Sequence, residues 1–395
     1  MKKLVKNNVS WVGKVDWELQ KFHGEEYSTD NGSTYNSYLI EEEKVVLIDT
    51  VWLPFANEFV ENLAKEIDLN KIDFIVANHG EVDHSGALPA LMKHIPETPI
   101  YCTANAVKSL KGQYHQDWNF KVVKTGDKID IGNNKSLIFV EMPMLHWPDS
   151  MATYLTEDNI LFSNDAFGQH LATDRLFNDL VDPCLLEKES LKYYANILTP
   201  FSAQLRRKLA EIISFNLQID IIATSHGVIW RDNPMQIVEK YAAWSQDYQE
   251  NQITIIYDTM WNGTKQMAEK IAEGIAEEDP EVVIKVINIA KTDDNDAASE
   301  IFKSKMVIVG SPTVSNSILH SMAGFLHFVK EMKFKNKKAA AFGCYGWSGE
   351  GVKVLNDLMS EAGFEIVDDG YKNLWNPDED ALKAAVAFGA SLASK

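Results

Sequence analysis

The sequence predicts an α/β protein built from two domains. The chain has 395 residues, more than the roughly 250 to 300 residues at which one hydrophobic core usually stops growing. Up to Gly227, short β-rich runs alternate with helical stretches. From Ile253 onward, apolar runs and helical patterns alternate regularly, as in a parallel sheet with helices on both faces. We therefore predict one domain over residues 1–250 and a second over residues 251–395.

The first domain is predicted from seven short β-rich runs. They cover residues 37–40, 44–50, 73–79, 99–103, 120–123, 136–142 and 219–226. Residues 187–215 carry apolar positions at roughly helical spacing and predict a pair of helices. Ionisable residues stand at or just beyond the ends of four runs: Asp49, His79, His146 and His226. Because α/β folds place their chemistry at strand ends, this pattern indicates a functional site there.

The second domain is predicted from a repeated strand and helix pattern. Strands are expected over residues 253–258, 282–289, 306–312, 337–343 and 364–367. Helices are expected from Lys265, up to Lys330, from Gly351 and from Glu379. The order of these elements favours a doubly wound parallel sheet. The acidic run at residues 293–296 predicts a solvated loop.

Composition excludes several classes of partner. The net charge is -19 and the pI is near 5.0, which opposes binding to the phosphate backbone of nucleic acids. No apolar run approaches the ~20 residues that a bilayer span needs, so we expect no membrane anchor. The amino-terminal segment lacks the apolar core of a secretory signal, which predicts a cytoplasmic protein.

The number and spacing of the cysteines exclude a disulfide-stabilised fold and a thiolate metal site. The three cysteines, Cys102, Cys184 and Cys344, are far apart, so the chain has neither a disulfide framework nor a CxxC pair for a small metal site. Any thiolate-ligated electron carrier is therefore expected to be another chain.

The sharpest local signal is the segment from His79 to His84, which follows a predicted strand and precedes a helical pattern. In an extended segment alternate residues point the same way, so His79, Glu81 and Asp83 can converge on one ion while His84 enters from the helix. A metal ion needs such convergence. Taken alone, the segment is equally compatible with a solvated acidic loop that carries two histidines.

Three more residues at strand ends favour the metal site over the solvated loop. His146, Asp165 and His226 each stand at or just beyond the end of an apolar run, beside a residue suited to a turn. With the four residues above they make seven possible ligands, more than one ion can use. Seven ligands suit two ions that share a carboxylate, which in two-metal sites lie about 3.5 to 4 Å apart.

Three loops of the second domain favour a bound nucleotide-like cofactor. A hydroxyl-rich loop between a buried strand and a helix amino terminus can bind phosphate through free backbone N–H groups and the helix dipole. The other two loops follow neighbouring strands near the switch point of the sheet, where glycines permit close approach and Tyr345 or Trp347 can flank a flat ring. The candidate residues are Thr259, Met260, Trp261, Asn262, Gly263 and Thr264 in the first loop, Ser311, Pro312, Thr313, Val314, Ser315 and Asn316 in the second, and Gly343, Cys344, Tyr345, Gly346, Trp347, Ser348 and Gly349 in the third.

The metal motif resembles the flavodiiron branch of the metallo-β-lactamase superfamily. The motif H-x-E-x-D-H is followed by His after 62 residues, Asp after a further 19 and His after a further 61. The resemblance implies an αββα sandwich for the first domain. It also implies two non-heme iron ions, one held by His79, Glu81 and His146, the other by Asp83, His84 and His226, with Asp165 bridging them.

Glu81 separates this motif from the hydrolase branch, which usually has His at that position. An additional carboxylate favours iron over redox-inert zinc because it is a hard, negatively charged ligand. In similar proteins, His23 and Tyr193 match positions beside the irons, where a proton donor assists reduction. A tyrosine within a helix is, however, more often a packing residue.

The loop after residue 258 resembles the phosphate loop of flavodoxins, T-x-T-G-x-T, with Trp261 and Asn262 departing from it. The two resemblances together imply a flavodiiron protein, which binds FMN and reduces dioxygen to water or nitric oxide to nitrous oxide. Two ferrous ions and one reduced FMN hold the four electrons that dioxygen requires. The family implies a rubredoxin or a reduced deazaflavin coenzyme as electron donor, and a head-to-tail homodimer or dimer of dimers in which each FMN faces the irons of the partner.

Two other functions remain open at this point. One is a dizinc hydrolase of the metallo-β-lactamase superfamily fused to a flavodoxin domain, which Glu81 disfavours. The other is a non-enzymatic flavin electron carrier, in which only the second domain matters. Neither the preference for one gas nor the identity of the donor follows from the sequence.

Overall fold

The computed structural model describes residues 2–395. Contacts divide the chain into two compact units. The first comprises the chain up to Tyr193 together with Phe201–Ala242, and the second comprises Tyr194–Pro200 and Ala243–Lys395. The main boundary therefore falls after residue 242, whereas the sequence pattern places it after residue 250. Among the described residues, no helix is both long and apolar enough to cross a membrane.

The first unit contains two large sheets. The strand order of the seven-stranded sheet is β1 (Lys3–Lys6), β2 (Val9–Trp11), β7 (Tyr38–Glu41), β8 (Val45–Ile48), β9 (Ile72–Val76), β10 (Ile100–Cys102) and β11 (Phe120–Val122). The five-stranded sheet has the order β12 (Lys128–Gly132), β13 (Lys135–Glu141), β14 (Met151–Leu155), β15 (Ile160–Asn164) and β16 (Ile221–Thr224). Two small ribbons pair β3 (Lys14–Asp16) with β6 (Ser33–Tyr35), and β4 (Lys21–Phe22) with β5 (Tyr27–Ser28).

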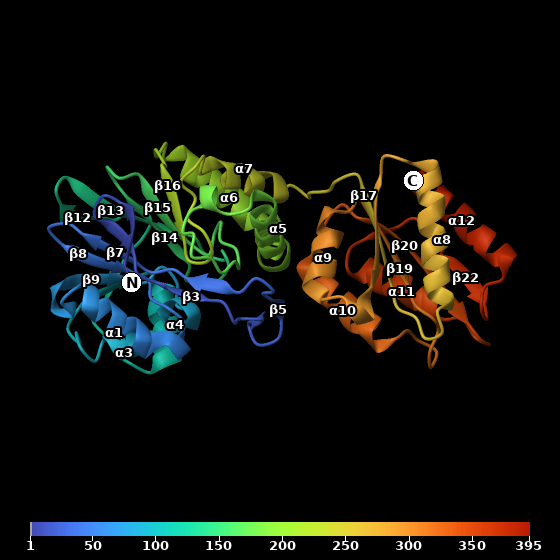
Figure 1. The fold of residues 1–395 in the computed structure, drawn as a ribbon, viewed down its shortest axis with the longest axis horizontal. Helices are drawn as coiled ribbons and strands as arrows, with labels where there is room; N and C mark the ends of the chain where they lie inside the picture. Colours follow the sequence, from blue (N-terminus) through green and yellow to red (C-terminus); the bar gives the residue numbers. More distant parts are fainter. Residues whose placement is uncertain (1) are drawn as a thin grey trace. The chain divides into compact units, whose positions relative to one another are not determined.

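The core of this unit lies between the two sheets. Ile48 and Val76 from the first sheet form one buried cluster with Phe139 and Phe162 from the second. Helices lie on both sides of the pair of sheets (Figure 1): α1 (Ala56–Glu66), α3 (Leu88–Leu91) and α4 (Ala104–Tyr114) on one side, α5 (Pro183–Tyr193), α6 (Ser202–Ser214) and α7 (Met235–Trp244) on the other. The arrangement is the αββα sandwich that the resemblance implies. Helices α5 and α6 are the pair predicted over residues 187–215.

The second unit contains one parallel sheet. Its strands follow the order β18 (Val283–Asn288), β17 (Gln252–Tyr257), β19 (Met306–Gly310), β20 (Lys338–Tyr345) and β21 (Glu365–Ile366), and β22 (Tyr371–Leu374) also pairs with β20. Every pairing is parallel. In chain order this is 2-1-3-4-5, the doubly wound order of flavodoxins, which places the carboxyl ends of β17, β19 and β20 at one edge.

Close packing of two helices covers one face of this sheet. Helix α8 (Gly263–Glu278) lies against α12 (Glu379–Ala393) (Figure 1). A Cβ atom on Gly274 would lie 1.9 Å from the carbonyl oxygen of Val386, so glycine is what permits this approach. Helices α9 (Asp294–Lys303), α10 (His320–Met332) and α11 (Gly351–Glu361) complete the unit.

The expected solvated loop at residues 293–296 is wrong, because helix α9 begins there. The side chain of Asp293 accepts a hydrogen bond from the backbone N–H of Asn295 at 2.9 Å and caps the helix. Asp294 and Asp296 occupy the first turn, where negative charge is stabilised by the helix dipole. The acidic run is therefore a helix start.

Candidate functional site

The ligand-type residues of the first unit lie on loops at the ends of strands. His79 and Glu81 lie between β9 and α2 (Val82–Ser85), and Asp83 and His84 lie on α2 itself. The carbonyl group of His84 accepts hydrogen bonds from the N–H and the hydroxyl of Thr50, at 2.7 and 2.8 Å, which fixes the short helix. The remaining three residues come from the β13–β14 loop (His146) and from the segments directly after β15 (Asp165) and β16 (His226).

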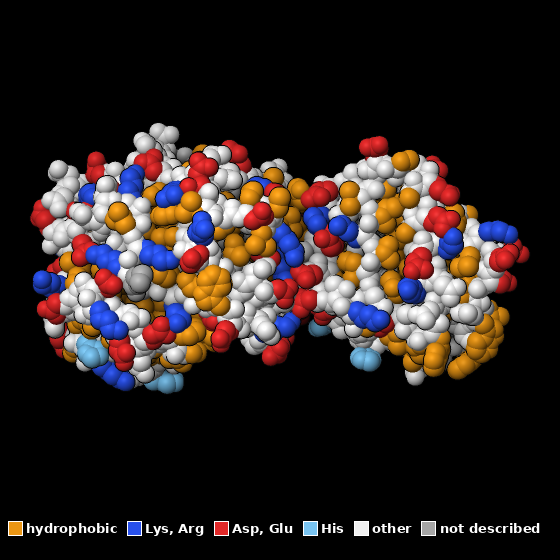
Figure 2. Space-filling model, viewed as in Figure 1, with side chains coloured by type: hydrophobic (Ala, Val, Ile, Leu, Met, Phe, Trp, Pro, Cys, Tyr) orange, Lys and Arg blue, Asp and Glu red, His pale blue; other side chains and the backbone are white. Residues whose placement is uncertain are grey.

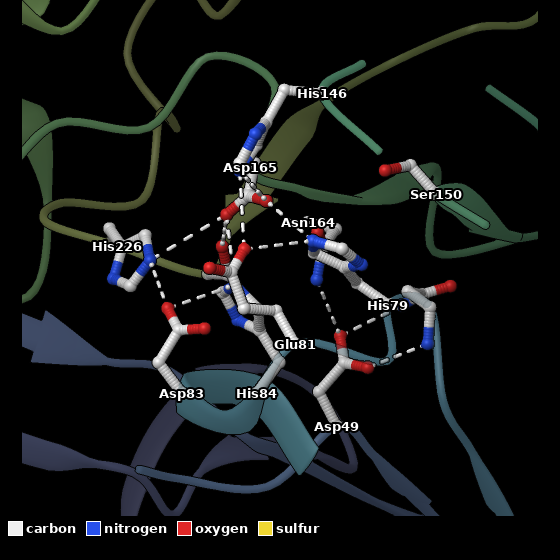
Figure 3. A network of polar contacts seen from close by, with 12 residues as sticks. Asp49, His79, Glu81, Asp83, His84, His146, Ser150, Asn164, Asp165 and His226 are labelled. Atoms are coloured by element: carbon white, nitrogen blue, oxygen red, sulfur yellow. Dashed lines mark hydrogen bonds and ion pairs between the residues drawn. The ribbon is translucent and has the colours of Figure 1, made fainter. Parts of the chain in front are cut away.

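All seven side chains converge, as Figure 3 shows, and they form two groups. We call the group of His79, Glu81, His146 and Asp165 position A, and the group of Asp83, His84 and His226 position B. Within each group the possible ligand atoms all lie within 4.8 Å of one another.

In position A, the carboxylates face two histidine nitrogens. The Oε2 atom of Glu81 lies 3.2 Å from Nε2 of His79 and 3.3 Å from Nε2 of His146. The Oδ2 atom of Asp165 lies 3.6 and 3.5 Å from the same two nitrogens.

Position B uses the other oxygen of Asp165. Its Oδ1 atom lies 3.0 Å from Nε2 of His84 and 3.6 Å from Nε2 of His226. The Oδ2 atom of Asp83 lies 3.1 and 3.0 Å from those nitrogens. Asp165 therefore presents one oxygen to each position.

These distances fit metal coordination. Two ligand atoms that are each about 2.1 Å from one ion lie about 3.0 to 3.4 Å apart in octahedral or tetrahedral geometry, close to the separations above. Both oxygens of Asp83, Nε2 of His84 and Oδ2 of Asp165 are buried and have no hydrogen-bond partner. Because buried polar atoms are normally satisfied, these atoms point to a ligand, and the residues present fit a pair of divalent or trivalent ions.

The electrostatics of the cluster favour positive charge beside the carboxylates. Burial favours the neutral form of Asp165, but the nearby imidazoles of His84, His79 and His146 lower its pKa well below its usual range. Burial opposes a charged His84, yet Asp165 and Asp83 outweigh this effect and raise its pKa to about 9. Positive charge is thus needed among these carboxylates, whether protons or metal ions supply it.

A buried carboxylate outside the two groups supports two of the ligand-bearing loops. Asp49 follows β8 and accepts hydrogen bonds from the N–H of Asn78 at 2.7 Å, from its side chain at 3.0 Å, and from the side chain of Asn164 at 3.4 Å. Asn78 directly precedes His79, and Asn164, labelled in Figure 3, directly precedes Asp165. Asp49, which the sequence shows as an ionisable residue at the end of a strand, therefore stabilises the backbone that carries His79 and Asp165. It does not belong to position A or to position B.

The two proposed proton donors differ in their contacts. His23, directly after β4, is exposed, and its Nε2 atom lies 3.2 Å from Oε1 of Glu81. Tyr193 is buried at the end of α5, and its ring centroid lies 6.5 Å from that of His226. Burial raises the pKa of Tyr193 well above its ordinary value. His23 thus touches position A directly, whereas Tyr193 packs behind position B.

The second unit has a cavity of 470 Å³ at the carboxyl edge of its sheet. Fourteen of its lining residues come from the three predicted loops: Thr259, Met260, Trp261, Gly263, Thr264, Pro312, Thr313, Ser315, Asn316, Cys344, Tyr345, Gly346, Trp347 and Ser348. Two further lining residues, Trp375 and Asn376, were not predicted. They follow β22, a strand whose polar sequence YKNL gives no apolar run to recognise. Their only sequence signal is an aromatic residue beside an Asn-Pro turn.

Five predicted loop residues do not line the cavity: Asn262, Ser311, Val314, Gly343 and Gly349. They shape the loops instead. Asn262 precedes α8 with a positive φ of 65°, and a Cβ atom on Gly343 would lie 2.1 Å from the carbonyl oxygen of Ser311. The hydroxyl of Ser311 accepts a hydrogen bond from the N–H of Leu319 at 3.1 Å.

The chemistry of the cavity fits FMN at both ends. The hydroxyl groups of Thr259 and Thr264 are buried without a hydrogen-bond partner beside the amino terminus of α8, which is a phosphate site by geometry and dipole. The rim carries exposed aromatic rings: Trp347 is 88% exposed and Trp375 61%, with centroids 6.2 Å apart. Such rings can cover a flat isoalloxazine.

Fold and site together define a class of protein: a two-metal metallo-β-lactamase-like unit joined to a flavodoxin-like unit. Sequence profiles agree with this class. Residues 34–227 match the family described as "ODP family beta lactamase", and residues 255–389 match the family "Flavodoxin". The predicted fold is confirmed.

The chain belongs to the flavodiiron protein family. It is 57% identical over 391 residues to the anaerobic nitric oxide reductase flavorubredoxin of Escherichia coli K12, covering 99% of this chain and 81% of that protein. The structure of the rubredoxin oxygen:oxidoreductase of Desulfovibrio gigas superposes with a TM-score of 0.95 at 34% identity, covering 100% of this chain and 98% of that one. The flavodiiron protein of Giardia intestinalis gives a TM-score of 0.94 at 34% identity, with 100% and 96% covered.

Proposed function

We propose that this chain is a flavodiiron oxidoreductase that reduces nitric oxide to nitrous oxide, dioxygen to water, or both, with FMN and two non-heme irons. The observation that carries this proposal is the placement of Asp165, whose two oxygens face the two groups of ligand-type atoms. The names of the relatives agree: one is a nitric oxide reductase and another a rubredoxin oxygen:oxidoreductase.

We assign the residues as follows. His79, Glu81 and His146 would hold one iron, Asp83, His84 and His226 would hold the other, and Asp165 would be shared between them. When bound, the irons supply a site for the gas and FMN supplies electrons one at a time. His23 and Tyr193 are the candidate proton donors, and His23 contacts Glu81 from the solvent side at 3.2 Å. Tyr193 closes the inner side of position B and excludes water through its buried ring.

The cavity of the second unit is assigned to FMN. The hydroxyls of Thr259 and Thr264 and the free N–H groups at the start of α8 bind the phosphate. Tyr345, Trp347 and Trp375 flank the ring system. Thr313 orders the loop below it, because its hydroxyl accepts a hydrogen bond from the N–H of Gly351 at 3.1 Å.

The electron donor is proposed to be a rubredoxin, with a reduced deazaflavin coenzyme as the other candidate. Among the described residues the three cysteines are free and form no thiolate cluster that could carry electrons. Free cysteines also fit a reducing compartment, so we place the protein in the cytoplasm.

We further propose a head-to-tail homodimer, alone or within a dimer of dimers. Electrons pass quickly only over short distances, and a closed two-fold pair lets each FMN face the irons of the partner. The apolar rim of the flavin cavity suits an interface, since Met260, Trp261 and Trp375 are 50%, 85% and 61% exposed. Figure 2 shows apolar side chains gathered at the lower edge of the second unit.

Anaerobic steady-state assays with each gas, using reduced rubredoxin and iron-reconstituted protein, test the activity. We expect turnover of at least one gas, and loss of turnover in His146→Ala with FMN retained. Zinc in place of iron together with no gas consumption would support a hydrolase instead. Unchanged turnover in His146→Ala would support a flavin carrier.

Co-expression of two inactive variants tests the dimer. A chain with His146→Ala, which lacks position A, is paired with one that carries Gly263→Trp, which fills the flavin cavity. Random pairing in a head-to-tail dimer restores roughly a quarter of wild-type activity, because one of the two sites works in half of the molecules. Each variant expressed alone is the control, and a mixture as inactive as either variant contradicts the arrangement.

A further inference from the structure

Two histidines, one in each metal position, are oriented by a hydrogen bond at the ring nitrogen that faces away from the cluster. In position A, Nδ1 of His79 lies 2.8 Å from Oδ1 of Asp149. In position B, Nδ1 of His226 lies 2.7 Å from the backbone carbonyl oxygen of Thr34. The first partner is a carboxylate and the second is a neutral amide. The two positions therefore differ in the charge behind their histidines.

The carboxylate of Asp149 is held in place on several sides. Asp149 is 1% exposed, and its Oδ2 atom accepts a hydrogen bond from the N–H of Gly80 at 3.1 Å. Its carbonyl oxygen accepts one from the hydroxyl of Thr103 at 3.0 Å, which also caps helix α4. A Cβ atom on Gly80 would lie 2.6 Å from Oδ2, so a glycine next to His79 makes room for this carboxylate.

We propose that Asp149 is a positioning residue that makes the two metal positions electronically unequal. By accepting the Nδ1–H of His79, it leaves Nε2 as the nitrogen that faces Glu81 and Asp165. A carboxylate partner makes a metal-bound imidazole a stronger donor than an amide partner does. Position A thus has Glu81, half of Asp165 and the histidine-bound Asp149, whereas position B has Asp83 and half of Asp165. Asp49 also lies near His84 of position B, but its carboxylate accepts hydrogen bonds from Asn78 and Asn164 and not from a histidine.

The difference in charge affects electron uptake. Additional negative charge stabilises the more oxidised state of a metal, so an iron held by the residues of position A would be harder to reduce than one held by the residues of position B. Position B would then be the position that favours the ferrous state. This inference rests on the proposed diiron function, which it deepens by giving the two ions different roles.

Stepwise reduction of the iron-loaded protein, followed by electron paramagnetic resonance and Mössbauer spectroscopy, tests the inference. We expect two separate one-electron potentials in the wild type. In Asp149→Asn, which keeps an oxygen at His79 but removes the charge, the potential of one iron rises and the other stays. A purely structural role would not shift one potential upward while both irons are retained.

The matched control is Asp158→Asn, since Asp158 is also 1% exposed but pairs with Lys135 at 2.7 Å rather than with a histidine. This control is expected to behave as the wild type. Equal potentials in the wild type, or an Asp149→Asn protein with both potentials unchanged, overturn the inference. So does an equal shift in Asp158→Asn.

Titration of the metal-free protein with Co²⁺ gives a second readout that does not depend on activity. Loss of an outer-shell partner typically weakens metal binding by about ten- to a hundredfold, so Asp149→Asn should lose affinity for one Co²⁺ and keep the other. Loss of both equally, or of neither, contradicts the proposal. If Asp149→Asn fails to fold, Asp149→Glu, which keeps the charge but moves the carboxylate away from Nδ1 of His79, replaces it: a change at one ion only supports the proposal, and no change at either ion overturns it. A wild type that binds fewer than two ions refutes the diiron function itself, which is a distinguishable outcome.

Discussion

Glu81 determines the charge of position A, because its carboxylate contacts His23, His79 and His146 at once. Each of these contacts joins a histidine to a carboxylate. A histidine at residue 81 would turn all three into histidine pairs and remove one negative charge. Hard oxygen ligands favour iron over zinc, whereas an imidazole ligand binds zinc as well as it binds iron.

Glu81→His is therefore expected to raise the ratio of bound zinc to bound iron at least tenfold when both metals are supplied. Glu81→Gln, which removes only the charge, should lie between this variant and the wild type. Elemental analysis after growth with equal amounts of the two metals measures the ratio. A wild-type ratio in both variants would show that Glu81 does not select the metal.

At the scale of single residues, the sequence indicated much of the site because the ligand types are rare and stand at strand ends. The seven predicted side chains are brought together in space. Asp149 and Asp49 could not be given roles, because a carboxylate that serves a neighbouring side chain is indistinguishable in sequence from a surface one. Trp375 was missed because the strand before it is polar.

Among the elements, helices α8 and α12 depend on glycine for their contact. Gly274→Ala would place a Cβ atom 1.9 Å from the carbonyl oxygen of Val386, and such overpacking costs about 1 to 3 kcal/mol. Gly324, on helix α10, is the matched control because a Cβ atom added there would meet nothing within 4 Å. At that position alanine should stabilise the helix by about 0.5 to 1 kcal/mol. Chemical unfolding should show a lower free energy of unfolding for Gly274→Ala and a higher one for Gly324→Ala than for the wild type. A change of the same sign in both variants contradicts the close packing of α8 on α12.

The loop before α8 is expected to control the affinity for FMN. The hydroxyl of Thr259 is buried without a hydrogen-bond partner. Thr259→Val should weaken FMN binding by about ten- to a hundredfold, the effect of losing one hydrogen bond to a charged group worth about 1.5 to 3 kcal/mol. The flavin-free protein should be no less stable, because the exchange removes an unsatisfied polar atom. Thr292→Val, outside the cavity, is the control, and equal affinity in both variants contradicts the assignment of the phosphate loop.

The start of strand β20 makes stability depend on pH. Lys337 is 3% exposed, and its ammonium group donates hydrogen bonds to the carbonyl oxygens of Tyr248 and Phe302 at 2.6 and 2.7 Å. Burial lowers the pKa of Lys337 to about 7, although Asp247 and Glu250 act in the opposite direction. Between this value and the unfolded value of about 10.4, the unfolded chain binds more protons. Stability therefore increases as pH rises through this window and is constant below it.

The expected contribution approaches about 1.4 kcal/mol per pH unit between about pH 7.5 and 9.5. Lys337→Met should remove this slope, whereas Lys335→Met, at an exposed position, should retain it. Free energies of unfolding measured at several pH values compare the three proteins. Parallel curves for the wild type and Lys337→Met would refute the effect.

Long apolar strands could be predicted from the sequence, whereas short or polar elements could not. Strands β17, β19 and β20 are buried along most of their length, so they appear as apolar runs. Strands β1 to β6 have two to four residues each, too few for a periodic pattern. Helix α9 was mistaken for a loop because its capping residues are all acidic or amidic, which is also the composition of a solvated turn.

At the scale of the whole molecule, two units of different chemistry share one chain. The resemblance predicted both folds and their order, because each unit carries its own motif at strand ends. A division at a single residue cannot describe both units, because residues 194–200 belong to the second unit although they lie between helices of the first in sequence. Contacts between residues distant in sequence leave no local signal.

The central claim is that side chains from separate stretches of the first unit hold two irons with Asp165 between them. The most direct measurement is the number of iron atoms per chain after anaerobic reconstitution, in the wild type and in Asp165→Ala. We predict two irons in the wild type and at most one in the variant, with FMN content equal in both. One iron or none in the wild type, or two in Asp165→Ala, would contradict the claim.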